Sequence, residues 1–160
     1  MLRISQYLAI MVLVLAVVSV AVGATFIYQA VEKDSWMQEA MRVEKVTLGL
    51  PESAAKDEVV DTAEEAQIAG DTIREHRRNI AATYDELLAG ERYDPTNQEH
   101  LSYAQALNME NYLYLAVLGF GVATVITVTG VFMILMGIAI GATGVALLGL
   151  VRRISQAGQA

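Results

Sequence analysis

This 160-residue chain contains no cysteine, and two long stretches of it contain no acidic or basic side chain. The lack of cysteine excludes both a disulfide framework and a thiolate metal site. No Asp, Glu, Lys, Arg or His occurs in the 28 residues between Arg3 and Glu32 or in the 41 residues between Glu110 and Arg152. A charge at the centre of a bilayer costs at least about 2.5–3.5 kcal/mol, so long uncharged apolar stretches are typical of membrane segments.

Sequence motifs for catalysis are also missing. The chain has no GxSxG, HExxH, P-loop or dinucleotide-binding pattern, and His76 and His100 are its only histidines. The uncharged stretches hold no residue for a proton relay or a charged transport site. We therefore expect no enzyme activity, no catalytic residue, no cofactor and no bound metal.

The acidic residues are confined to the middle of the chain. All eighteen lie between Glu32 and Glu110 together with eight basic residues, which gives this region a net charge of −10. The other basic residues are Arg3, Arg152 and Arg153, at the outer ends of the uncharged stretches. Because Lys and Arg near membrane segments stay preferentially in the cytoplasm, both termini are predicted to be cytoplasmic.

This charge pattern predicts a multi-pass protein of the cell membrane in four parts, with its acidic part outside the cytoplasm. An acidic domain of this kind repels nucleic acid, so we expect no nucleic-acid partner. The predicted parts are an N-terminal transmembrane helix acting as a signal anchor at 1–30, an acidic extracytoplasmic helical domain at 31–111, a C-terminal transmembrane helix with an apolar extracytoplasmic extension at 112–151, and a short cytoplasmic tail at 152–160.

The N-terminal segment has two interpretations. Its apolar core, Leu8–Val22, could belong to a cleavable signal peptide. The apolar stretch continues to Ile27, however, and Phe26 and Tyr28 resemble an interfacial aromatic belt, which favours an uncleaved anchor.

The second uncharged stretch is longer than one crossing requires. As a straight helix, 41 residues would rise about 62 Å, twice the thickness of the hydrocarbon core. The alternatives are one long helix or a hairpin that turns near Thr127–Gly130. We favour the long helix, because the turn lacks Asn, Asp and Pro. The surplus near Tyr112–Thr124 then needs a cover, for which a partner subunit is the obvious candidate.

The predicted fold class is an all-α membrane protein whose two transmembrane helices flank a small up-down bundle. The first helix is expected to end before Gly49 and Pro51, and Gly90 is a plausible stop for a later one. A break at Gly70–Asp71 would give four helices of similar length. Their expected ranges are 28–48, 52–69, 71–89 and 97–111.

Two capping boxes support this division, at Thr72–Glu75 and Thr96–Glu99. The rival is an unbroken middle helix, because apolar spacing of three and four residues continues through Gly70.

Small residues recur at intervals of seven in both uncharged stretches. Such a period keeps small side chains on the seam of a left-handed helix pair, where backbones approach closely. Gly137 and Gly141 add a GxxxG step that could contact a neighbouring subunit. The predicted helix-packing residues are Ala9, Ala16, Gly23, Ala30, Ala116, Ala123, Gly130, Gly137, Gly141 and Gly144.

Charged clusters offer weaker candidates. Arg74, Arg77 and Arg78 could contact an anion or a partner's acidic surface, although pairing with carboxylates of neighbouring helices is the commoner role of such arginines. Carboxylates also crowd one helix, where a solvated surface is the ordinary interpretation. These carboxylates belong to Asp57, Glu58, Asp61, Glu64 and Glu65.

These features favour a non-enzymatic structural or accessory subunit of a self-assembled or larger membrane complex. Its expected partners are the lipid bilayer and copies of itself or other membrane subunits. One alternative is an extracytoplasmic sensor or ligand-binding module that signals through a partner, by analogy of layout with receptors. A weaker alternative is a homo-oligomeric pore lined by Thr124 and Thr127.

Overall fold

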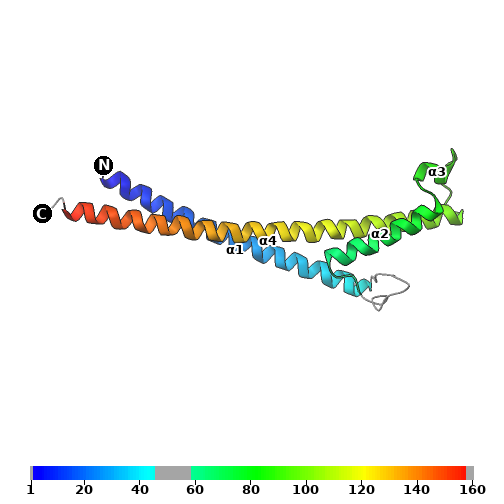
Figure 1. Cartoon of the computed structure of the whole chain (residues 1–160), viewed down its shortest axis with the longest axis horizontal. Helices are drawn as coiled ribbons and strands as arrows, with labels where there is room; N and C mark the ends of the chain where they lie inside the picture. Colours follow the sequence, from blue (N-terminus) through cyan, green and yellow to red (C-terminus); the bar gives the residue numbers. More distant parts are fainter. Residues whose placement is uncertain (1, 46–58, 158–160) are drawn as a thin grey trace. The chain divides into compact units, whose positions relative to one another are not determined.

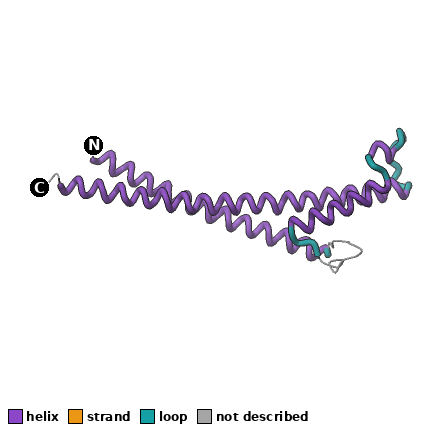
Figure 2. The backbone as a smooth tube through the Cα atoms, in the orientation of Figure 1, coloured by secondary structure: helices purple, strands orange, loops and turns teal. Residues whose placement is uncertain are grey.

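The structure, a computed structural model, describes residues 2–45 and 59–157. These residues form four α-helices and no β-strand (Figures 1 and 2), which confirms the predicted all-helical class for the described part of the chain. The helices are α1 at Leu2–Glu44, α2 at Ala63–Ile80, α3 at Tyr84–Leu88 and α4 at Gln98–Ala157.

Two helices are long and apolar enough to cross a membrane. They are α1, with 43 residues, and α4, with 60 residues. Their lengths correspond to rises of about 65 and 90 Å. Helix α4 continues without interruption through Thr127–Gly130, so the structure has the single long helix and not the hairpin.

The chain divides into two compact units. The first consists of Met1–Glu32 and Thr124–Ala160, and the second of Lys33–Ala123. In the first unit, α1 and α4 run antiparallel, and the start of α1 lies at the same end of the unit as the end of α4 (Figure 1). Within α1, the first unit ends at Glu32, which is the first acidic residue of the chain.

In the second unit, α2 packs antiparallel to α4 and contacts the end of α1. The buried core consists of Val60, Ala66 and Ala69 together with Leu113 of α4. Partly buried apolar side chains surround this core: Met41, Ile73, Ala116 and Val117. Part of the apolar segment of α4 near Tyr112–Thr124 is thus covered by α1 and α2 of the same chain. We had expected a partner subunit to cover this segment.

The predicted break at Gly70 is wrong. Helix α2 passes through Gly70 without interruption, because this glycine serves close packing and does not end the helix. A Cβ atom there would lie 3.0 Å from the ring of Tyr114 on α4. The hydroxyl of Thr72 donates to the carbonyl oxygen of Ile68 at 2.9 Å, a bond of the helix interior, so Thr72–Glu75 is not a capping box.

The capping box of α2 lies earlier, at Thr62 and Glu65. Each side chain there accepts a hydrogen bond from the other residue's backbone N–H. At its other end, α2 stops at Ile80, and only the five-residue helix α3 follows. The expected division into four helices of similar length is therefore wrong.

The predicted end of the first helix moves by a few residues. Helix α1 ends at Glu44 and not at residue 48, because Lys45 adopts a left-handed conformation (φ +50°) and its N–H donates to the carbonyl oxygen of Arg42. The signals at Gly49 and Pro51 lie outside the described residues.

The start of α4 is capped by Asn97 and not by Thr96. The Asn97 side-chain oxygen accepts the N–H of Glu99 at 2.9 Å, whereas the hydroxyl of Thr96 donates to Asp94 at 2.7 Å. The predicted Thr96–Glu99 capping box is therefore wrong. The helix that follows Gly90 begins at Gln98, close to its expected start.

Candidate functional site

Helices α1 and α4 approach each other closely at two glycines in the first unit. A Cβ atom on Gly23 would lie 2.6 Å from the carbonyl oxygen of Gly130, and one on Gly130 would lie 2.7 Å from the carbonyl oxygen of Gly23. Neither position has room for a side chain. The two backbones therefore touch through a pair of glycines, as small residues allow in helix pairs.

The line of contact between α1 and α4 in the first unit, called the seam below, continues in one direction from this pair through Gly137 and Gly144. A Cβ atom on Gly137 would lie 2.9 Å from the carbonyl oxygen of Ala16, and one on Gly144 would lie 2.9 Å from the side chain of Leu13. The hydroxyl of Ser19 donates across the seam to the carbonyl oxygen of Met133 at 2.8 Å. Close packing and the hydrogen bond from Ser19 to Met133 thus both join the two helices.

Most of the small residues singled out by the seven-residue spacing are buried. The buried ones are Ala9, Ala16, Gly23, Ala30, Ala123, Gly130, Gly137 and Gly144. Ala116 is half-buried against the core of the second unit, and Gly141 is half-buried with its Cβ position 3.4 Å from the Cβ atom of Ala16. Both glycines of the GxxxG step have neighbours on α1 of the same chain, and the predicted contact of this step with a neighbouring subunit stays a prediction.

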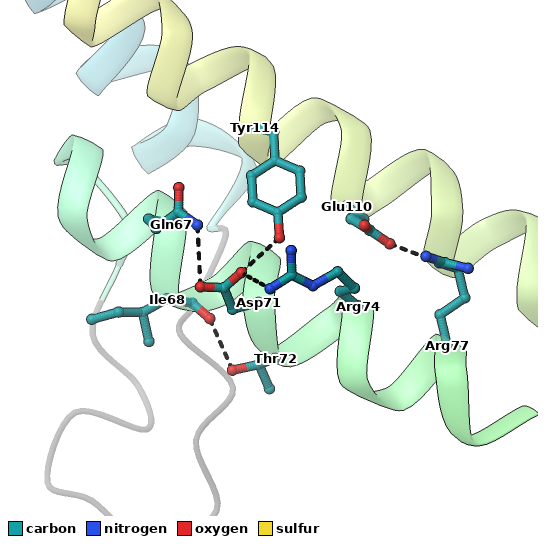
Figure 3. Close-up of polar contacts among 8 residues, drawn as sticks. All are labelled: Gln67, Ile68, Asp71, Thr72, Arg74, Arg77, Glu110 and Tyr114. Carbon is teal, nitrogen blue, oxygen red and sulfur yellow. Dashed lines mark hydrogen bonds and ion pairs between the residues drawn. The ribbon is translucent and has the colours of Figure 1, made fainter. Parts of the chain in front are cut away.

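A buried ion pair joins α2 to α4 in the second unit. The Nε of Arg77 donates to Glu110 at 2.7 Å, with the two side chains only 10% and 9% exposed (Figure 3). Arg77 also donates to the hydroxyl of the buried Tyr103, and its guanidinium lies 4.9 Å from the centre of that ring. The hydrogen bond to Glu110 raises the pKa of Arg77.

A second polar cluster surrounds Asp71. Its carboxylate accepts hydrogen bonds from Tyr114 at 2.7 Å, Gln67 at 3.1 Å and Arg74 at 2.6 Å (Figure 3). The bond from Tyr114 is the main cause that lowers the pKa of Asp71, followed by the bond from Gln67. The Arg74 guanidinium also lies 5.7 Å from the centre of the Tyr114 ring.

Two of the three predicted anion-contact arginines are thus engaged with carboxylates of this chain. Arg78 is exposed, and no ion pair or hydrogen bond joins it to the rest of the described chain. Tyr103, which bonds Arg77, and Tyr114, which bonds Asp71, were not predicted from the sequence. One signal was available, because Arg77 falls on the apolar spacing of its helix, where a charge needs a buried partner.

Asp61 and His100 take part in local contacts. Asp61 pairs with Arg42 at 2.6 Å, and the Nδ1 of His100 accepts the N–H of Asp94 at 3.0 Å. Within residues 2–45 and 59–157, no three His, Asp or Glu side chains are placed to hold a metal ion. Asp57 and Glu58 of the carboxylate cluster lie outside the described residues.

An exposed apolar stripe remains on α4 in the second unit, and it consists of Leu115, Leu118 and Val122. Leu115 is 59% exposed and Leu118 is 62% exposed, whereas Phe120 on the opposite side of the helix is buried. A Cβ atom on Gly119 would lie 2.6 Å from the sulfur of Met37. The stripe therefore lies on a part of α4 that runs beside the charged end of α1.

Comparison with protein-family models, curated proteins and solved structures found no match for this chain. A functional assignment therefore depends on the seam, the buried ion pair and the exposed apolar stripe.

We expect Gly23→Ala to destabilise the protein by about 1–3 kcal/mol, because the new methyl group would overlap the Gly130 backbone. The measurement is the free energy of unfolding of the full chain in detergent micelles. Gly149→Ala is the matched control, since a Cβ atom there meets nothing within 4 Å. It should not destabilise the protein, because alanine has the higher helix propensity and meets no neighbour there. Equal effects of the two substitutions would contradict the glycine contact.

Arg77→Met should cost about 3–5 kcal/mol, because Glu110 would remain buried without its partner. Replacing Glu110 by Met in the same chain should recover much of that loss. Unfolding in urea can be followed by the fluorescence of Trp36, which lies in the second unit and is the chain's single tryptophan. The exposed neighbour gives the control, and Arg78→Met should change stability by less than about 0.5 kcal/mol.

Asp71 should make stability depend on pH in the acid range. Its pKa is depressed in the folded state, so its contribution is complete above the unfolded pKa of about 3.9 and is lost as pH falls through the depressed value. Asp71→Asn should lower the melting temperature at pH 7, and its difference from the wild type should shrink toward pH 3. A difference that stays constant across this range would exclude the effect. Glu75→Gln on the same helix is the control.

Proposed function

We propose that this chain is a non-enzymatic integral membrane protein that acts as a structural or accessory subunit of a self-assembled or larger membrane complex. Its proposed work is done by contacts of the two long helices and of the acidic domain between them. The termini are then cytoplasmic, and residues 31–111 lie outside the cytoplasm.

The surface of the first unit supports its insertion in lipid. Only 11% of the most apolar window of each long helix is buried within the chain, whereas the core helix of a soluble protein would be mostly buried. Large apolar side chains such as Val17, Leu135 and Val145 point outward from the helix pair. No water-soluble arrangement of two helices alone could cover such a surface, and a bilayer covers it without further protein.

The exposed apolar stripe on α4 is the observation that supports a protein partner. It runs beside α1 beyond Glu32, where Lys33 and Asp34 keep α1 out of the hydrocarbon core. The stripe of Leu115, Leu118 and Val122 is then exposed to water. Apolar side chains that continue one face of a helix in water are typical of a protein–protein contact.

A photo-crosslinking amino acid at Leu118 tests this proposal in native membranes. We expect a crosslinked product of defined mass from position 118 and none from position 75, an exposed polar site on α2. Coexpression of two differently tagged copies shows whether the product is a dimer of this chain or contains another subunit. The proposal fails if positions 115, 118 and 122 all give no protein adduct.

A further inference from the structure

A groove lies between α1 and α4 in the second unit. Its volume is about 850 Å³, within the range of small-molecule sites. Two aromatic side chains at the groove are largely exposed, Trp36 at 67% and Tyr112 at 72%. Met37 and Met41 of α1 and Leu113 of α4 supply apolar lining.

The groove has only one ionisable acidic or basic lining residue. This is Glu44, near the end of α1, and the amide of Asn108 on α4 is the other polar side chain apart from the Tyr112 hydroxyl. The nearby cation Arg42 is engaged with Asp61, and none of the ion pairs among the described residues includes Glu44. Among the described residues, the carboxylate thus has no ion-pair partner.

We propose that this groove binds a lipophilic organic cation, such as a quaternary ammonium or phosphonium with apolar substituents. The apolar substituents would contact the methionines and Leu113, and the cation would lie between Glu44 and the aromatic rings. Aromatic faces attract organic cations, and at exposed sites this attraction is worth about two- to fivefold in affinity.

The surrounding charge favours the same class of ligand. Residues 32–110 carry a net charge of −10, which raises the local concentration of cations and repels anions. This ligand site goes beyond the proposed subunit function, because its ligand is a small molecule and not a protein. Leu115 belongs both to the groove and to the apolar stripe, so the experiment has to separate the two.

The experiment uses Trp36, which is the single tryptophan of the chain and lies in the groove. The full chain in phosphatidylcholine nanodiscs is titrated with tetraphenylphosphonium and, separately, with tetraphenylborate, an anion of nearly the same shape. We expect a saturable blue shift of the tryptophan emission with the cation, and no such shift with the anion.

Glu44→Gln should weaken binding of the phosphonium about fivefold, as expected for loss of one exposed charge partner. Glu39→Gln removes the same charge from α1 at a position that does not line the groove, and it should change the affinity by less than twofold.

Four results would overturn the proposal. A shift that never saturates indicates partition into lipid, and an equal response to tetraphenylborate indicates an apolar groove without charge selection. Equal weakening by the Glu39 and Glu44 substitutions indicates only the general field of the domain. If Glu44→Gln also abolishes the crosslink at Leu118, the groove belongs to the contact with a protein partner. An unchanged crosslink keeps the ligand site separate from the subunit function.

Discussion

The antiparallel register of α1 and α4 decides which residues of the chain lie beside one another. In the first unit this register places Gly23 against Gly130, at a distance that leaves no room for a Cβ atom on either residue. In the second unit it places Met37 beside Gly119. Because of this pairing, the uncharged surplus of α4 lies beside the charged end of α1. The apolar stripe and the groove on α4 both result from that arrangement.

Sequence patterns predicted the helical class of the fold. They did not predict how residues such as Gly70 and Asn97 are used, because such residues can serve more than one structural role. The all-helical class followed from the spacing of apolar residues at three and four positions, which is typical of helices. Gly70 was misinterpreted because a glycine can end a helix or admit a neighbouring ring, and the choice depends on Tyr114, which is 44 positions away. Asn97 was missed because Asp94, Thr96 and Asn97 are all good capping residues, and only the backbone geometry selects one of them.

The polar contacts between α2 and α4 could also not be predicted from the sequence. The position of Arg77 on an apolar spacing indicates a buried charge, but it does not identify Glu110 or Tyr103 as the partners. Many of the chain's eighteen acidic residues could have served equally well. Breaking a buried pair is costly, so a register of α2 on α4 that separated Arg77 from Glu110 would be disfavoured.

The same two helices are thus held together by different forces along their length. In the proposed membrane, lipid is as apolar as the helix surfaces, so association depends on close backbone contact and on bonds such as that from Ser19 to Met133. In the second unit, water favours burial of apolar side chains such as Leu113, while Gly119 again allows a close contact, here with Met37. An apolar face of α4 that is left open in water therefore carries a cost that the same face would not carry in lipid. Under the proposed membrane placement, this difference makes the stripe at Leu118, and not the outer surface of the first unit, the stronger argument for the proposed partner.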